Sequence, residues 1–463
     1  MARKKKKSSK SKILKIPVYK GKFGQKEVER LLWRAGFGPR PGDIHRYKRL
    51  GMKRAVQSIV TPKRKAKLVG PTPKLEDPLK PDDIWGHDHI WWLDRMVRSN
   101  HQLEERMTLI WHDWFATSND GVGNQKLMVA QNEMLRKNCL GSFRGLLYNV
   151  TVDPAMLVWL SGDGSDKRAP NENYGREMME LFTLGAGARY TEDDVREQAR
   201  ALTGFTSEWS EAEGQHNFHF EDKRHDNGTK TIFGQSGNFG WQDSCNLCIN
   251  HPDHAAFFVQ KLWSYFIPVP LHGKNLKAFV SLYKRKGYRV RPVVQAILMH
   301  PAFYQGPAMI KPPIVYTAGL LRAQNAGITS DAWSWLAEGT GQRLFYPPNV
   351  AGWDDDAWLD TGRFRGRWNV TRYATEEALL DPSKDEVVDN YPIDETAEQA
   401  YAKVLAFWGS PTVSGPTRGV LLDFANKAGK QADSAKWKKQ PYRVMRQNAM
   451  RTLFAMSPDH QTS

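Results

Sequence analysis

The chain has 463 residues, of which 40% are hydrophobic, with 17 Trp, three Cys and a formal net charge of +17. This apolar content excludes a wholly disordered chain, and three cysteines exclude a scaffold held together by disulfides. No apolar run reaches the roughly 18 residues that a membrane-spanning helix needs.

Positive charge is concentrated at the N-terminus. Residues 1–22 contain ten Lys or Arg and no acid, which leaves a net charge of +7 for the other 441 residues. A run of like charges predicts a flexible tail over residues 1–24, which either contacts nucleic acid or an anionic surface or is simply solvated. The run contains no apolar segment of the kind found in secretory signals, so we expect a cytoplasmic protein.

Helical spacing dominates the rest of the chain. Apolar residues at i, i+3, i+4 and i+7 predict a helix that starts at Gln25 and ends at Gly36. Residues 61–81 and 345–370 are predicted as irregular segments because Pro and Gly interrupt them. The same reasoning predicts helices near residues 51–60, 83–99, 102–117, 124–138, 141–149, 171–184, 192–203, 242–250, 254–266, 274–285, 291–300, 311–326, 330–338, 396–408, 416–427 and 435–456.

The period of the pattern changes between residues 206 and 238. Phe218 and Phe220 alternate with polar residues, and Asn227-Gly228 precedes a second short run typical of a strand. An Asn-Gly pair beside alternating residues predicts a β-hairpin that turns at Asn227-Gly228.

These patterns together predict a mainly α fold. We expect one large multi-helix domain over residues 25–457, arranged in one or two lobes, with a small β-hairpin insertion near residues 206–238. Residues 458–463 are predicted as a C-terminal tail.

Two carboxylates share one face of the helix predicted over residues 171–184. Glu177 and Glu180 are three residues apart, which places both side chains on one stripe of a helix, beside an apolar stripe. Such a pair suits a divalent metal, or acid–base chemistry by a carboxyl group with a raised pKa. The alternative is structural, because Arg176 and Glu180 have the spacing of an i,i+4 ion pair.

Two histidines precede aspartates directly. His112 lies in Trp111-His-Asp-Trp-Phe115, on a helix rich in aromatic residues, and is either a ligand or base or a neutral histidine of the core. His225 and Asp226 lie at the predicted hairpin turn, where an imidazole and a carboxylate can coordinate a metal or orient water. The alternative is that Asp226 and Asn227 supply turn chemistry.

Two further clusters contain side chains that bind metals or sugars in other proteins. The spacing C-x2-C-x2-H-x2-H occurs over Cys245–His254, and it is more compact than the usual zinc motifs, which favours buried thiols. The acids Asp354–Asp356 follow the segment Pro347–Trp353. Three acids beside Trp residues are typical of a cation or sugar site, and equally of an exposed turn.

Several short motifs occur in an order that resembles one family. They are Leu31–Gly38, Trp111–Phe115, Asn171–Gly185, Tyr190–Val195, Ala201–Gly204, His225-Asp226, Lys230–Gly234, His251-Pro252, Lys261–Trp263 and Pro347–Trp353. Together they resemble the large bacterial family catalogued as domain of unknown function 1800, over about residues 25–457.

The resemblance implies no assigned reaction. Members of this family are commonly exported, and they are often encoded beside proteins that resemble sulfatases and alkaline phosphatases. This chain departs from the family in its lysine-rich tail, and at Trp114, where a second histidine is common.

The leading hypothesis is a metal-dependent enzyme, either a hydrolase or an oxidoreductase. Glu177, Glu180 and His225 would hold a divalent metal (Fe, Mn or Zn), His112 would be a ligand or base, and Asp226 would orient them. The first alternative is a non-catalytic binding or assembly partner of a sulfatase- or phosphatase-like protein. The second alternative is nucleic-acid binding through residues 1–22.

Overall fold

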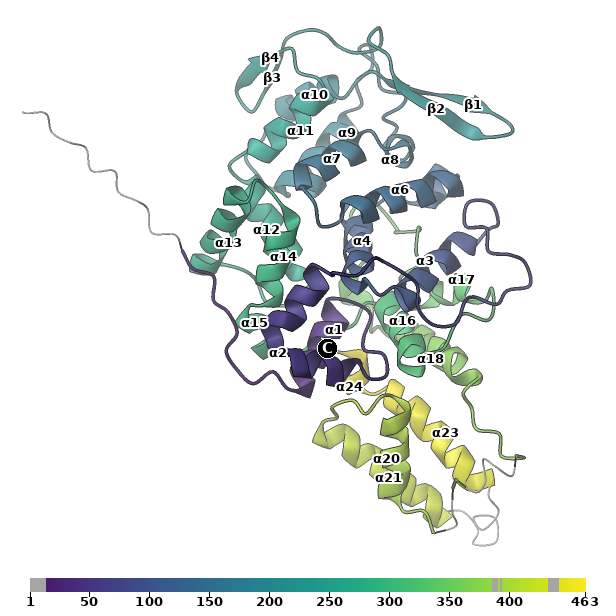
Figure 1. The fold of residues 1–463 in the computed structure, drawn as a ribbon. Coiled ribbons are helices and arrows are strands. Elements are labelled where there is room, and N and C mark those ends of the chain that lie inside the picture. The colour runs from purple at the N-terminus through teal and green to yellow at the C-terminus, as the bar shows by residue number, and fades with distance from the viewer. Residues whose placement is uncertain (1–13, 385–389, 392–393, 432–440) are drawn as a thin grey trace, which may run out of the picture.

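Helix α4 (Gln102–Trp114) separates two hydrophobic cores in the computed structural model, which describes residues 14–384, 390–391, 394–431 and 441–463. Ten of the 13 residues of α4 are buried. Met107, Ile110 and Trp111 pack into the first core, and Leu109 packs into the second. A helix that is buried around most of its circumference is enclosed by its neighbours, and α4 accordingly lies near the middle of the molecule (Figure 1).

The first core is built by helices of the N-terminal two thirds of the chain. Its elements are α1 (Gln25–Arg34), α2 (Asp43–Val60), α6 (Gln125–Asn138), α7 (Phe143–Thr151), α8 (Pro154–Trp159), α9 (Glu172–Glu177), the π-helix η1 (Met178–Leu184), α10 (Glu192–Ala201), α11 (Trp241–Asn250), α12 (His254–Ser264), α13 (Gly273–Arg285), α14 (Val290–Leu298) and α15 (Pro301–Gln305). Apolar spacing explains their buried faces: α14, for example, buries Val290, Val293 and Ile297.

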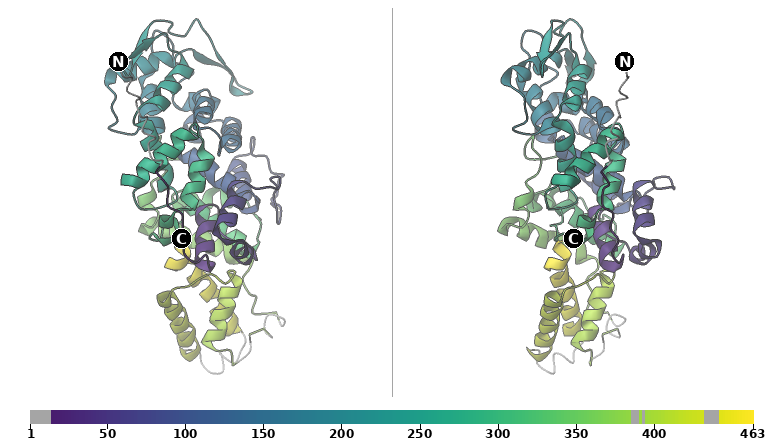
Figure 2. Two further views of the ribbon diagram at one scale, coloured as in Figure 1. Left: turned by 60° about the vertical axis from the view of Figure 1, so that its left-hand side comes forward. Right: turned by 90° about the vertical axis from the view of Figure 1, so that its left-hand side faces the viewer.

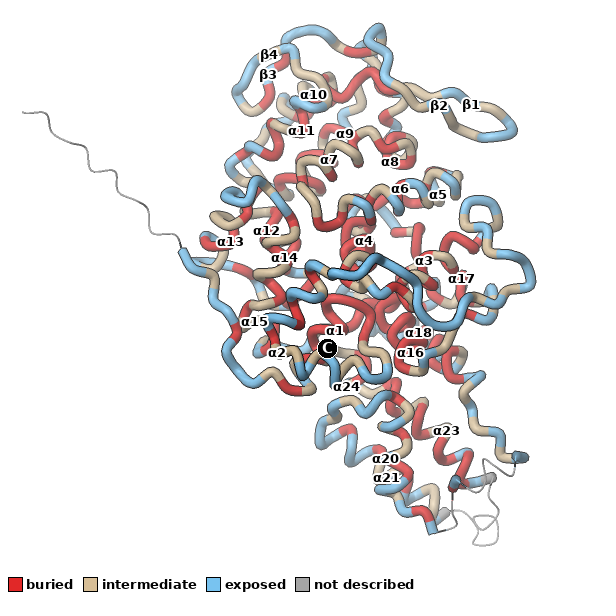
Figure 3. Tube along the Cα trace, in the orientation of Figure 1, coloured by how far each residue is buried: buried red, intermediate tan, exposed pale blue. Residues whose placement is uncertain are grey.

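The second core joins α3 to helices of the C-terminal third. Its elements are α3 (His87–Arg98), α5 (Asn119–Val122), α16 (Pro313–Gln324), α17 (Trp333–Leu336), the 3-10 turns η2 (Glu338–Thr340) and η3 (Asp355–Ala357), α18 (Thr361–Glu376), α20 (Ala397–Phe407), α21 (Gly415–Gln431), α23 (Pro441–Ala455) and α24 (Pro458–Gln461). Helices α20, α21 and α23 form the end of the molecule opposite the strands (Figure 2). Buried segments run through the centre, and exposed ones lie at both ends and in loops around the middle, such as residues 61–81 (Figure 3).

The predicted β insertion is present, but it contains two hairpins and its turn lies elsewhere. Strands β1 (Phe205–Ser210) and β2 (Gly214–Phe220) pair antiparallel, as do β3 (Lys230–Ile232) and β4 (Gln235–Gly237). The second hairpin turns at Phe233-Gly234, where both residues have positive φ, as a two-residue type I′ turn requires.

The hairpin turn predicted at Asn227-Gly228 is therefore wrong. These residues lie in the connection between the two hairpins, where the Asp226 carboxylate accepts a hydrogen bond from the backbone N–H of Gly228 at 2.8 Å. A local turn of this kind has the same composition as a hairpin turn. The mainly α fold class with a small β insertion is confirmed.

Both ends of the described chain pack against the body. The backbone N–H of Tyr19 donates to the Met299 carbonyl at 2.8 Å, within the segment predicted as tail, whereas residues 1–13 lie outside the described residues. Residues 458–463, expected as a tail, include α24, and His460 and Gln461 are buried. Within the described residues, no helix is long and apolar enough to cross a membrane.

Part of the irregular segment predicted over residues 345–370 is helical. Helix α18 begins at Thr361, because Asp360 caps it by accepting a hydrogen bond from the backbone N–H of Arg363 at 2.8 Å. Its apolar pattern is weak because Arg367 is fully buried, where its guanidinium donates to the carbonyls of Trp358 and Lys311. Residues 345–360 remain irregular except for η3.

Candidate functional site

Asp113, on the last turn of α4, lies where the two cores meet. Its Oδ2 accepts a hydrogen bond from the Tyr265 hydroxyl at 2.7 Å, and its Oδ1 accepts one from the backbone N–H of Trp353 at 2.9 Å. Tyr265 follows α12 and packs against the first core, whereas Trp353 belongs to the second core. Both carboxylate oxygens are thus fixed by segments far apart in the sequence.

The chain can reach Asp113 only because residue 352 is glycine. Gly352 has a φ of 96°, which favours glycine, and a Cβ atom there would collide with the Asp113 carboxylate and lie 2.8 Å from the Asp113 carbonyl oxygen. The segment Pro347–Trp353 therefore passes directly over the end of α4.

Two further charged residues face the same place. Asp355 belongs to η3, and burial of its carboxyl group, followed by the charge of Asp113, raises its pKa to about 7. Taken over all its atoms, the residue Asp355 is exposed to solvent, and it also lines the cleft beside Asp113. Arg106 belongs to the same helix as Asp113, α4, and is 4% exposed. Burial lowers the pKa of its guanidinium to about 10, so that Arg106 remains a cation at neutral pH.

These residues enclose a small opening, which we call the Asp113 cleft. Its free volume is about 20 Å³, enough for roughly one water molecule. The indole N–H of Trp358 lines it and has no hydrogen-bond partner among the described residues. The lining residues are Arg106, Leu109, Ile110, Asp113, Tyr265, Met309, Pro312, Gln342, Asp355 and Trp358.

Lys261 connects this region to the π-helix η1. Its ammonium group donates to the Leu181 carbonyl at 3.1 Å and lies 4.6 Å from the centre of the Trp114 ring. Burial lowers the pKa of Lys261 to about 8, and the charge of Asp113 opposes that change. Trp114, the position at which the resemblance implies a histidine, donates its indole N–H to the Phe182 carbonyl at 3.1 Å. Side chains from α12 and α4 thus satisfy carbonyls at the end of η1.

Glu177 and Glu180 lie together, as predicted from their spacing. Burial and then the charge of Glu180 raise the pKa of Glu177, and the Tyr190 hydroxyl lies 3.5 Å from Glu180 Oε2. The alternative ion pair between Arg176 and Glu180 is not the one formed: Arg176 pairs with Glu192 of α10 at 2.6 Å.

His225 and Asp226 have structural partners. His225 Nδ1 lies 2.9 Å from the Thr203 carbonyl oxygen, and its side chain is buried. Asp226 forms an ion pair with Arg200 at 2.6 Å, and this hydrogen-bonded pairing lowers the pKa of Asp226 to about 2. These contacts fasten the connection between the hairpins to the end of α10.

His112 is enclosed by aromatic rings. Its ring centre lies 5.3 Å from that of Trp92 and 5.5 Å from that of Trp353, and its Nε2 has no partner among the described residues. Burial lowers the pKa of His112 to about 3. His112 adjoins the Asp113 cleft through Trp353 but does not line it.

The described residues include no group of three or more His, Cys, Asp or Glu side chains placed to hold a metal ion. This finding gives no support to the metal hypothesis for Glu177, Glu180 and His225, which stays a prediction. Cys245 and Cys248 are buried thiols of the first core, as their compact spacing favours.

Sequence reasoning missed most of the cleft. The sequence pattern points to His112, whereas the structure places its neighbour Asp113 in the polar site. The pattern also points to the acids Asp354–Asp356, but it does not indicate that Asp355 lies beside Asp113. Arg106 and Tyr265 carried no signal, because they are far from Asp355 in the sequence. The motif Lys261–Trp263 is visible in the sequence, but its residues alone indicate no role for it.

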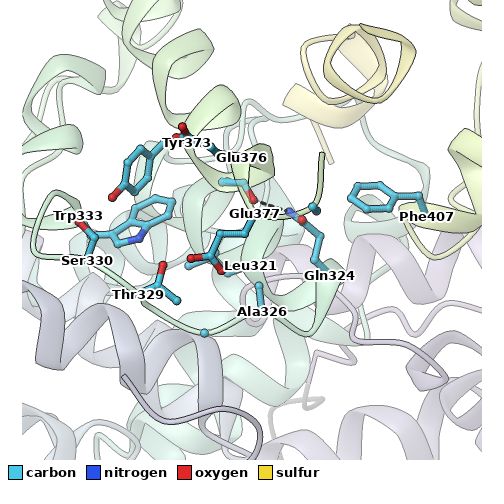
Figure 4. A pocket seen from close by; sticks show the side chains of 13 residues that line it. Leu321, Gln324, Ala326, Thr329, Ser330, Trp333, Tyr373, Glu376, Glu377 and Phe407 are labelled. Carbon is cyan, nitrogen blue, oxygen red and sulfur yellow. Dashed lines mark hydrogen bonds between the residues drawn. The ribbon is translucent and has the colours of Figure 1, made fainter. Parts of the chain in front are cut away.

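A separate pocket of about 560 Å³ lies between α16, α18 and the segment before α17 (Figure 4). Trp333, Tyr373 and Phe407 line it, together with Glu376 and Glu377, and its lining contains no Lys or Arg. None of the ordered motifs contributes to this pocket, so we place the candidate site at the Asp113 cleft.

Comparison with known proteins gives one match. Neither a search of curated proteins nor a search of solved structures found a similar protein. A family model described as a protein of unknown function (DUF1800) matches residues 30–462, which include every residue of the Asp113 cleft. The chain therefore belongs to the DUF1800 family.

Proposed function

We propose that this protein is an enzyme that uses Asp113 and Asp355 for acid–base chemistry, and that it activates a water molecule in a hydrolytic reaction. The observation that supports this most is the convergence on Asp113, where Tyr265 and the backbone N–H of Trp353 hold one carboxylate from two cores. Fixed carboxylates at the junction of two packed units are typical of active sites.

The two carboxyl groups take different roles. Asp113 accepts two hydrogen bonds, which favour its charged form, although burial raises its pKa. Asp355 has a pKa of about 7, so both its protonated and its charged forms are populated at neutral pH. A group of this kind can take a proton from water and return it to a leaving group. Asp355 is therefore the acid–base residue, and burial, followed by the charge of Asp113, raises its pKa.

Arg106 supplies the positive charge of the site. Its guanidinium is buried beside both carboxyl groups, and its charge opposes the rise in the pKa of each. A fixed cation in a place of low polarity stabilises negative charge that develops on a reacting oxygen. The cleft itself has room for about one water molecule next to these groups.

The test compares Asp355→Asn with Asp356→Asn, which removes a neighbouring acid outside the lining of the cleft. Full-length protein is assayed against chromogenic esters, glycosides and phosphodiesters across pH 5 to 9. Removing a general acid–base residue costs about 10²- to 10⁴-fold in rate, and we expect Asp356→Asn to stay within about twofold. Hydrolysis that survives both Asp355→Asn and Asp113→Asn would contradict the proposal.

A divalent metal at Glu177, Glu180 and His225 is a second proposal. One observation supports it: burial, and then the charge of Glu180, raises the pKa of Glu177, and a bound cation would relieve the repulsion between the two carboxylates. Plasma mass spectrometry of untagged protein purified without chelator is expected to find Fe, Mn or Zn that is lost in Glu177→Gln. Metal-free protein after incubation with all three ions would end this hypothesis.

A further inference from the structure

A pocket of about 300 Å³ lies between α1, α2 and the turn before α4, and we call it the arginine pocket. Five cationic side chains line it against a single carboxylate, that of Asp43. The cations are Arg40, Arg46, Arg64, Lys67 and Arg322. The pocket shown in Figure 4 has the opposite character, with two acids and no Lys or Arg in its lining.

Arg322, from α16, is the buried base of the arginine pocket. It is 4% exposed, and its guanidinium donates to the carbonyls of Gly38 at 3.0 Å and Val97 at 2.7 Å. Its nearest carboxylate oxygen belongs to Asp43, at 4.0 Å. Burial, and then the charge of Arg40, lowers the pKa of Arg322 to about 9. Carbonyl groups orient this guanidinium but do not neutralise its charge.

Arg40 and Arg322 converge on one acceptor. Arg40 Nη2 also donates to the Val97 carbonyl, at 2.6 Å, and to the Val69 carbonyl at 2.7 Å. Asp43, whose Oδ2 is the carboxylate oxygen near Arg322, also pairs with Arg46: Arg46 Nη2 lies 3.7 Å from Asp43 Oδ1. Arg46 and Arg322 thus share one carboxylate, and the Arg40 guanidinium donates to backbone carbonyls, which leaves positive charge uncompensated in a concave site.

The irregular segment that carries Arg64 and Lys67 is fastened over the pocket. The backbone N–H of Lys67 donates to Asn100 Oδ1 at 2.8 Å, and His101 Nε2 lies 2.8 Å from the Arg64 carbonyl oxygen. These contacts hold two basic residues of a Pro-rich connection at the mouth of the pocket.

We propose that the arginine pocket binds a tetrahedral oxyanion, a phosphate or sulfate group carried on a small organic molecule. Paired guanidinium groups match the geometry of such oxygens and bind them with two parallel hydrogen bonds. The volume exceeds that of the anion alone, and Leu32 and Ile59 provide apolar surface for an organic part. This site is separate from the Asp113 cleft, and it does not depend on the reaction proposed there.

The test is calorimetric titration of the full-length protein with inorganic phosphate and, separately, inorganic sulfate, at constant ionic strength. Arg46 is exposed, so Arg46→Gln should fold, and Lys53→Gln is the matched control, because Lys53 is an exposed cation of the same helix outside the pocket. We expect about a tenfold loss of affinity in Arg46→Gln and less than about twofold in Lys53→Gln. Arg322→Gln should remove the binding in any preparation that folds.

The outcomes separate clearly. Tighter binding of phosphate assigns the site to a phosphate ester, and tighter binding of sulfate assigns it to a sulfate ester; either supports the proposal. Equal weakening by Arg46→Gln and Lys53→Gln would overturn it, since that result shows attraction to overall charge. No measurable binding of either anion at about 10 mM would also overturn it.

Discussion

Two aspartates of this protein lie in opposite electrostatic settings. Asp226 pairs with Arg200 and also accepts the Gly228 N–H, and its pKa is lowered to about 2. Asp355 faces another carboxylate in a partly closed cleft, and its pKa is raised to about 7. The charge of Asp226 stabilises the fold, whereas the charge of Asp355 is held at an energetic cost. The comparison shows that partners, more than residue type, separate a structural acid from a reactive one.

Their places in the fold account for this difference. Asp226 lies in the connection between the two hairpins, close to the end of α10. Arg200 of α10 is therefore near enough to pair with it. Asp355 lies in the segment that crosses from one core to the other, where Asp113 is already engaged by Tyr265 and Trp353. The carboxyl group of Asp355 therefore meets a second acid there, and the charge of Arg106, which acts on both acids, only partly offsets the rise in its pKa.

The largest effect is expected from Gly352→Ala. The added Cβ would strain a residue with a φ of 96° and push the Asp113 carboxylate away from Trp353. We expect a loss of about 2–3 kcal/mol in the free energy of unfolding, and about a hundredfold loss of any activity of the cleft. Urea unfolding and the hydrolysis assays above measure both.

The matched control is Gly362→Ala, in helix α18. A Cβ atom at residue 362 meets nothing closer than 3.6 Å, so alanine should leave stability unchanged or raise it slightly. Similar losses in the two variants would show that the close approach of Gly352 to Asp113 does not matter.

Asp226→Asn should destabilise the fold by about 1–2 kcal/mol, because it removes the charge that Arg200 binds. The pKa of Asp226 lies below its ordinary value of 3.8, so its contribution is complete above about pH 4 and is lost as the pH falls toward 2. The difference in unfolding free energy between wild type and variant should therefore shrink as the pH falls through this window. A difference that stays constant from pH 7 to pH 2 would contradict the ion-pair explanation.

Asp355→Asn should have the opposite sign. Between about pH 4 and 7 the folded protein holds a proton on Asp355 that the unfolded chain has released, so wild-type stability falls as the pH rises through this range. Because Asp355 is an exposed residue, solvent reduces the cost, and we expect the variant to be more stable by about 1 kcal/mol at pH 8. Near pH 4 the two should be equal. Destabilisation at pH 8 would give Asp355 the same structural role as Asp226.

The sequence was most informative where apolar spacing decides the structure. Helix α14, for example, follows from its spacing, because burial of one face is a local property of the pattern. The turn of the second hairpin escaped prediction, because Phe233 carries no preference for positive φ and the tertiary fold imposes it. Arg367 shows the same limit, since only long-range carbonyl partners make a buried arginine acceptable.

The candidate site was predictable only in pieces. The motifs that contain Asp113, Lys261 and Trp353 are all visible in the sequence, but nothing local indicates that they meet. The spacing of Glu177 and Glu180 did predict their proximity, since helix geometry fixes it. The partner of Arg176 could not be predicted in the same way, because Glu192 competes with Glu180 from another helix.

The smallest effect is expected at His112, where the sequence predicted a ligand or base. Burial lowers its pKa to about 3, so the ring stays neutral from pH 5 to 9, and its Nε2 has no partner among the described residues. Replacing an unpaired buried polar group with an apolar ring of similar shape costs little, so His112→Phe should change the unfolding free energy by less than about 1 kcal/mol. The pH dependence of hydrolysis should keep its transition near pH 7, because Asp355 sets that transition. If His112→Phe instead removes that transition while Asp355→Asn leaves it, the proton moves through His112, and the acid–base role belongs to the histidine.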